Sequence, residues 1–174
     1  MNLDELRERT SQGKNLHTEF KLWPINTNRF AETLVAFANT DGGQLLLGVS
    51  DTGTLAGVED TDAVMRTVDN VAYNNCQPPL TIVQEALRFD GEQAVVIVNI
   101  PQGDQRPYST NTGKYSIRTT SGRRLASQQE LLRLFQRSRS IYYDETPFLR
   151  TSLNDLYQRD IEHFFQQSQG YSLE

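Results

Sequence analysis

The stretch Ala36-Phe-Ala-Asn-Thr-Asp-Gly-Gly-Gln-Leu-Leu-Leu-Gly-Val-Ser-Asp51 decides the fold, because it contains the end of a helix, a turn and a core strand. Apolar residues recur at helical spacing over 28–39, which predicts a helix with one broad apolar face. The segment 39–43 combines two glycines with side chains that hydrogen-bond their own backbone, so the helix ends there in a tight turn. The nearly unbroken apolar run at 44–49 is typical of a strand covered on both faces.

The flanking sequence predicts an α+β fold, in which helices pack on a mixed or antiparallel sheet. Residues 16–22 alternate in polarity, which predicts a half-buried strand with Phe20 and Leu22 facing the core. Glu19 and Lys21 would then lie together on the exposed face. The strands are expected at 16–22, 44–50, 54–58, 80–89, 93–100 and 114–119, and the helices at 3–9, 28–39, 60–75, 128–137 and 151–167.

Length and composition fit a soluble protein with one main core. The chain has 174 residues, of which 37% are hydrophobic, and a chain of this size can bury a core without disulfides or metals. One cysteine and two histidines exclude an internal disulfide and a Cys/His zinc site. Neither a membrane span nor a signal peptide is visible, which predicts a cytoplasmic protein. We expect a domain at 1–125, and at 126–174 a helical extension that leads toward a further C-terminal region.

Basic residues are concentrated late in the chain. Eight lie between Arg106 and Arg139 against one acid, Glu130, a local charge of +7, whereas the whole chain carries −5. Such a concentration is typical of a surface that contacts nucleic-acid phosphates. The alternative is that these arginines pair with acids elsewhere in the fold, and the sequence alone leaves both interpretations open.

Several motifs together resemble the Schlafen AlbA-like domain. They are Glu19-Phe20-Lys21, the helix end and turn at 36–43, Leu46-Leu47-Gly48-Val49, Asp51 and Gly53, Gly57-Val58 and the strand at 114–118. The order and spacing match the family over roughly residues 12 to 125. The segment that follows is similar to the extension of bacterial proteins described as transcriptional regulators.

This resemblance implies nucleic-acid binding, with DNA favoured over RNA, by a homodimer that acts in transcription regulation. The basic residues expected to contact the phosphate backbone are Lys21, Lys114, Arg118, Arg123 and Arg124. Contacts of this kind position a protein on nucleic acid without reading its base sequence.

The resemblance also implies an enzymatic alternative, a divalent-metal-dependent nuclease. Relatives with this activity hold Mg²⁺ or Mn²⁺ with three carboxylates, two of which correspond to Glu19 and Asp51. The third position falls on or near Lys14, so the set is incomplete and we expect no catalytic metal. Asp41 lies in the nearby turn, where a backbone-capping role is expected.

A third possibility is an oligomerisation or protein-interaction module. ATP binding is not expected, because the sequence has no Gly-x-x-x-x-Gly-Lys-[Ser/Thr] motif and the turn at 41–43 leads into a strand rather than a helix.

Overall fold

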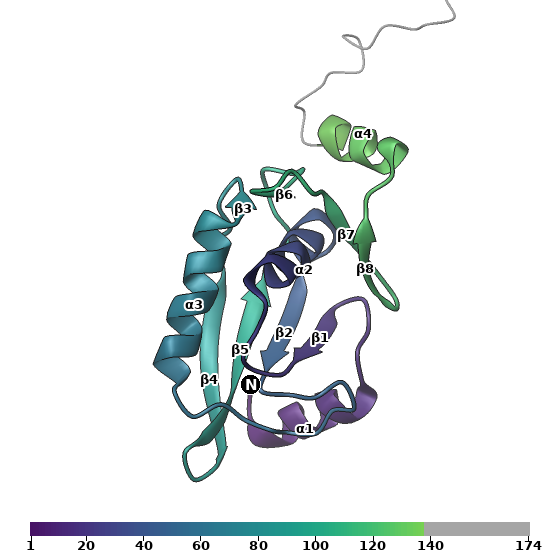
Figure 1. The fold of residues 1–174 in the computed structure, drawn as a ribbon. Coiled ribbons are helices and arrows are strands. Elements are labelled where there is room, and N and C mark those ends of the chain that lie inside the picture. The colour runs from purple at the N-terminus through teal and green to yellow at the C-terminus, as the bar shows by residue number, and fades with distance from the viewer. Residues whose placement is uncertain (138–174) are drawn as a thin grey trace, which may run out of the picture. The chain divides into compact units, whose positions relative to one another are not determined.

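A four-stranded mixed sheet forms the centre of residues 1–137, the part of the chain that the computed structural model describes (Figure 1). Its strand order is β1-β2-β5-β4, with β1 parallel to β2 and the other pairs antiparallel. The predicted α+β class is therefore confirmed. The four strands are Thr18–Lys21 (β1), Gly43–Leu47 (β2), Val83–Asp90 (β4) and Gln93–Ile100 (β5).

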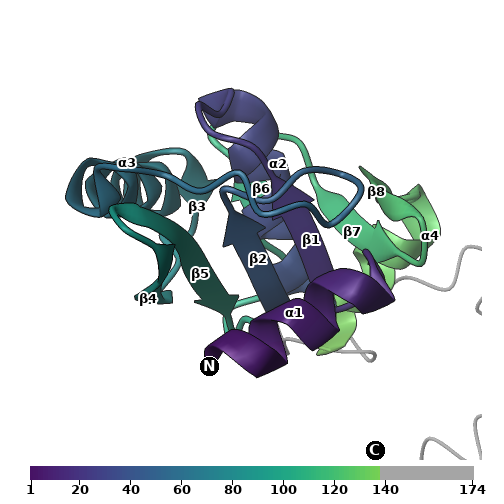
Figure 2. The ribbon, with the colours of Figure 1, turned by 90° about the horizontal axis from the view of Figure 1, so that it is seen from below.

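Helices cover both faces of this sheet (Figures 1 and 2). Helix α1 (Leu3–Gln12) lies on one face, where Leu6 joins a core with Phe20 and Leu46. Helices α2 (Thr27–Asn39) and α3 (Thr61–Asn74) lie on the other, over a larger core. Alternate residues of β2 and β5 enter the two cores, which explains why the runs at 45–47 and 94–98 are apolar without alternation.

The α2–β2 connection follows the prediction from the sequence. Helix α2 begins where the Asn26 side chain accepts a hydrogen bond from the Arg29 amide, and it ends at Asn39. The Gly42 amide donates to the Phe37 carbonyl at 3.0 Å, with Gly42 at φ +70°. Glycine adopts this conformation without steric cost, so the chain can turn directly from the helix into the sheet.

A hairpin and a short helix complete the described chain. Strands β7 (Ser116–Thr119) and β8 (Gly122–Leu125) pair beside α2, and α4 (Gln128–Arg137) follows them. Ser127 and Glu130 form the predicted capping box at the start of α4. Two short strands, β3 (Cys76–Gln77) and β6 (Ser109–Thr110), pair with each other within what the sequence indicated was loop.

Three local predictions are wrong. Residues 54–58 form no continuous strand and contribute only isolated bridges, from Leu55 to Val49 and from Val58 to Ala94. Leu22 lies beyond the end of β1 and is 52% exposed. Glu19 is buried, because the β1 face opposite Phe20 is covered by the chain around Arg118.

The described residues belong to one compact unit, which runs from residue 1 to residue 140. The helix expected at 151–167 lies outside the described residues, and the domain boundary expected after residue 125 stays a prediction. Within residues 1–137, no helix combines the length and the apolar character that crossing a membrane requires.

Candidate nucleic-acid interface

A buried ion pair lies where β1, β7 and α2 meet. The Arg118 guanidinium donates from Nη1 to Glu19 Oε2 at 2.7 Å. It also donates to the backbone carbonyls of Leu16 and Asn15, at 3.2 and 2.7 Å. Its Cζ lies 4.4 Å from the centre of the Phe37 ring, a cation–π geometry.

This arrangement corrects the expectation that Arg118 lies on the surface. Its side chain is 1% exposed, and all three guanidinium nitrogens have partners within the fold. Arg118 therefore stabilises the junction and has no donor directed at solvent. Asn39 and Thr40 hold the same junction, since Asn39 bonds the backbone of Tyr108 and Ser116 and Thr40 Oγ1 accepts from the Arg118 amide.

Lys14 bridges the two carboxylates that the nuclease alternative requires. Its ammonium donates to Asp51 Oδ1 at 2.6 Å and lies 2.9 Å from Glu19 Oε1. Burial would raise the pKa of Glu19, but the hydrogen bonds from Arg118 and Lys14 outweigh it and leave the pKa below its ordinary 4.5. The hydrogen bond from Lys14 likewise lowers the pKa of Asp51.

These residues do not fit a divalent metal ion. The position between Glu19 and Asp51 is filled by an ammonium group, and the second Glu19 oxygen is bound to Arg118. The Asp41 carboxylate accepts a hydrogen bond from Gln102 and forms no group of three ligands with Glu19 and Asp51. Among residues 1–137, no group of three or more His, Cys, Asp or Glu side chains is placed to hold a metal ion.

Three of the predicted basic residues pair with acids near the surface. Glu32 on α2 binds both Lys114, at 2.8 Å, and Arg123, at 2.6 Å, and these bonds lower its pKa although burial opposes the shift. Arg124 donates two hydrogen bonds to Glu130, which lower the pKa of that carboxyl to about 2. The alternative considered from the sequence, that these basic residues pair with acids elsewhere in the fold, therefore holds for Lys114, Arg123 and Arg124.

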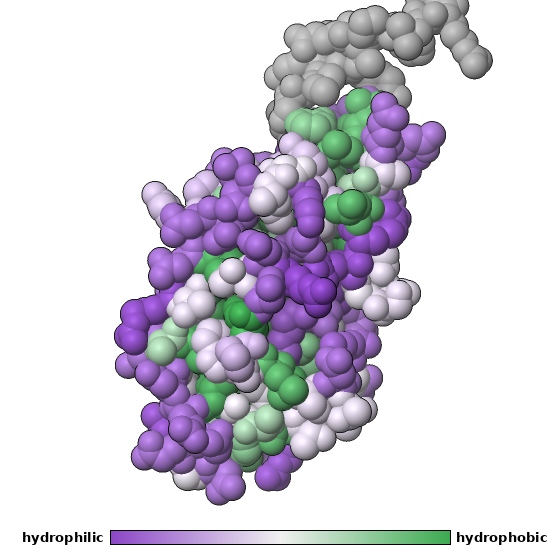
Figure 3. All heavy atoms as spheres, in the orientation of Figure 1, coloured by the Kyte–Doolittle hydropathy of each residue, from purple (hydrophilic) through white to green (hydrophobic). Residues whose placement is uncertain are grey.

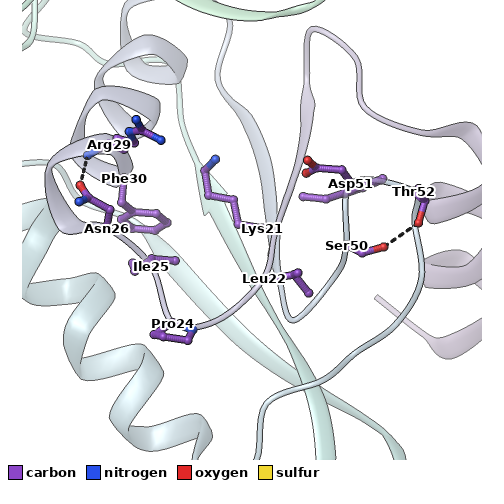
Figure 4. Close-up of a pocket in the computed structure, with 11 residues that line it drawn as sticks. Lys21, Leu22, Pro24, Ile25, Asn26, Arg29, Phe30, Ser50, Asp51 and Thr52 are labelled. Atoms are coloured by element: carbon purple, nitrogen blue, oxygen red, sulfur yellow. Dashed lines mark hydrogen bonds between the residues drawn. The ribbon is translucent and has the colours of Figure 1, made fainter.

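A cleft of about 530 Å³ lies between the start of α2 and the turn after β2 (Figure 4). Lys21 stands between its walls, with Arg29 on the helical side and Asp51 on the other. Among residues 1–137, the side chains of Lys21 and Arg29 make neither an ion pair nor a hydrogen bond. Burial lowers the pKa of Lys21 below its ordinary 10.5. The charges of Glu19 and Asp51 oppose this shift, whereas those of Lys14 and Arg123 reinforce it.

One positively charged region, which we call the basic surface, combines the two cations of the cleft with the Lys114 and Arg123 side chains that bind Glu32. Arg29 and Glu32 lie one turn apart on α2, and the charge of Arg123 acts on Lys21. The basic surface comprises Lys21, Arg29, Lys114 and Arg123, with Glu32 as its acid. Sequence patterns did not single out Arg29 or Glu32, because the relevance of these residues depends on partners distant in the chain.

Two solved structures of bacterial proteins are similar to this chain in fold. The N-terminal domain of a protein related to the ATP-dependent DNA helicase RecG, from Nitrosomonas europaea, has a TM-score of 0.55 and 24% identity, over 74% of this chain and 91% of that one. The DIP2311 protein from Corynebacterium diphtheriae has a TM-score of 0.51 and 18% identity, over 70% of this chain. The alignment spans only 24% of DIP2311, and at these identities the likeness shows the fold alone. No curated protein matches this sequence.

The family comparison covers the sheet, the cleft and the basic surface together. The model of the family described as Schlafen, AlbA_2 matches residues 14–127, from Lys14 to the residue that caps α4. The match includes the β1 tripeptide Glu19-Phe20-Lys21 and the α2–β2 turn. The chain therefore belongs to the Schlafen AlbA_2 family.

Proposed function

We propose that this chain binds nucleic acid through phosphate contacts made by the basic surface. The observation that carries the proposal is that Lys21 and Arg29 lie in one cleft of a Schlafen AlbA_2 domain and have no partner among residues 1–137. Cations without an internal partner are the ones free to replace the counterions of a phosphate backbone.

The charge balance of the basic surface supports the same proposal. With Asp51 of the cleft counted as well, four cations face two acids, so the net charge of this region is +2 in a chain whose total is −5. Lys114 and Arg123 remain partly exposed while bound to Glu32, at 52% and 25% of their side chains. Arg124 contributes less, because Glu130 neutralises it.

The proposal assigns no hydrolytic step to the domain, because Lys14 occupies the space between Glu19 and Asp51. We propose that this chain is the nucleic-acid-binding domain of a transcriptional regulator. It would prefer DNA to RNA, and two copies would act as a homodimer. These last three features rest on the family resemblance. Affinities for matched DNA and RNA strands test the preference, and the mass of the free protein in light scattering tests the dimer.

The test of this function is a titration of three labelled ligands with the whole chain: double-stranded DNA, single-stranded DNA and structured RNA. Each titration is run with Mn²⁺ and with a chelator, and both retention and cleavage of the nucleic acid are measured. We expect salt-sensitive retention without cleavage. Glu32→Gln removes the acid from the basic surface and should tighten binding, whereas Glu92→Gln, the same change in the β4–β5 turn, should not. Mn²⁺-dependent cleavage that Asp51→Asn abolishes would establish a nuclease instead, and no retention at low salt would refute nucleic-acid binding.

A further inference from the structure

The cleft beside Lys21 has an apolar wall that phosphate binding does not explain. Leu22, Pro24 and Ile25 follow β1 directly and line the cleft opposite the turn that carries Ser50 and Thr52. Leu22 is 52% exposed, one of few large apolar side chains so exposed among residues 1–137. The face that carries the β1–α2 connection shows apolar residues among mainly hydrophilic ones (Figure 3).

We propose that the cleft receives one unpaired nucleotide of a nucleic-acid strand, with its phosphate on Lys21 and Arg29 and its base on the apolar wall. This inference rests on the proposed function and narrows the ligand from nucleic acid in general to a strand with an unpaired base. The volume of about 530 Å³ is within the roughly 300–1,000 Å³ typical of small-ligand sites. A paired base within a duplex cannot enter such a cleft, because its faces and edges are already covered.

The polar groups of the cleft match the parts of a nucleotide. Lys21 and Arg29 are cations without partners among residues 1–137, and a phosphate between them would form charge-assisted hydrogen bonds. Lys14 occupies only Oδ1 of Asp51, whose side chain is 86% exposed, so Oδ2 is available to accept from a base amino group or a sugar hydroxyl. Leu22, Pro24 and Ile25 offer the apolar contact that an unstacked base needs.

The test compares an oligonucleotide of about 15 nucleotides with the duplex of the same sequence, at one salt concentration, using the whole chain. Leu22→Ala truncates one side chain of the apolar wall, and its exposed position makes loss of folding unexpected. The matched control is Val83→Ala, which truncates another exposed apolar side chain, on β4. Competition by deoxyadenosine monophosphate shows whether the ligand of the cleft is a nucleic-acid strand or a free nucleotide.

We expect the single strand to bind more tightly than the duplex, and Leu22→Ala to lower single-strand affinity by roughly fivefold or more. Val83→Ala should have no effect, and the mononucleotide should compete only weakly. Equal binding of strand and duplex, or equal affinities of the two variants, would overturn this inference and leave the proposed function standing. A mononucleotide that binds as tightly as the strand would assign the cleft to a free nucleotide. If neither polymer binds, the proposed function fails and the inference fails with it.

Discussion

A single buried arginine joins segments that are far apart in the sequence. Arg118 contacts Glu19, Leu16 and Asn15, which lie 99 to 103 positions earlier in the chain. Removing one partner of a buried ion pair leaves the other charge without its main compensation. Arg118 is therefore a structural residue within a segment whose composition suggested a binding role.

Arg118→Ala should lower the free energy of unfolding by about 3–5 kcal/mol, the usual cost of breaking a buried pair from one side. Chemical denaturation followed by circular dichroism measures the change. Arg124→Ala is the control, because it removes an arginine of the same segment from an exposed pair and should hardly move the midpoint. Equal midpoints for the two variants would contradict the structural role of Arg118.

Glu19 makes stability depend on pH in the acidic range. Its pKa is lowered in the folded protein, so its contribution is present above the ordinary value of 4.5 and is lost as the pH falls through the lower folded pKa. Between about pH 6 and pH 3, the wild type should therefore lose more free energy of unfolding than Glu19→Gln does. Parallel stability curves for the two proteins would show that Glu19 does not titrate in this way.

Among the elements, the turn between α2 and β2 packs closely against the backbone at the end of β5. A Cβ atom on Gly42 would lie 2.6 Å from the Ile100 carbonyl oxygen and 2.7 Å from the Gln102 amide nitrogen. In Gly42→Ala, the positive φ and the backbone clash should together lower the free energy of unfolding by about 1–3 kcal/mol or more. Gly91→Ala, at φ +52° with nothing within 4 Å of its Cβ, isolates the cost of the backbone conformation. Thermal unfolding should show a larger loss of stability for Gly42→Ala than for Gly91→Ala. Equal losses of stability would contradict the predicted clash.

These elements also show what the sequence can and cannot predict. The helix, turn and strand of 28–49 follow from periodicity and turn chemistry, which act between near neighbours in the chain. The capping box of Ser127 and Glu130 is equally local and is confirmed. The burial of Arg118 and the pairing of Arg123 with Glu32 were not predictable, because the partners lie 99 and 91 positions away. For the candidate site, the residues predicted from the sequence include Lys21, which lines the cleft, but not Arg29.

For the whole molecule, the distribution of charge matters more than its total. The fold pairs Arg118, Arg123, Arg124 and Lys114 with acids, so four of the eight cations counted between Arg106 and Arg139 have a partner within the fold. The unpaired charge of the basic surface lies instead at the cleft, on Lys21 and Arg29. An acidic protein can bind an anionic polymer in this way, because surface charges more than about 8–10 Å away are screened in physiological salt.

The most direct test of nucleic-acid binding is the slope of log affinity against log salt concentration for the wild type and two double variants. Lys21→Ala with Arg29→Ala removes the cations of the cleft, and Arg66→Ala with Arg88→Ala makes the same charge change on α3 and β4, toward the opposite edge of the sheet. Each lost phosphate contact should reduce the slope by about 0.7 to 0.9, so the cleft variant should lose roughly 1.4 to 1.8 together with affinity. The control variant should keep the wild-type slope. Identical slopes for the cleft variant and the wild type would contradict the assignment of phosphate binding to Lys21 and Arg29.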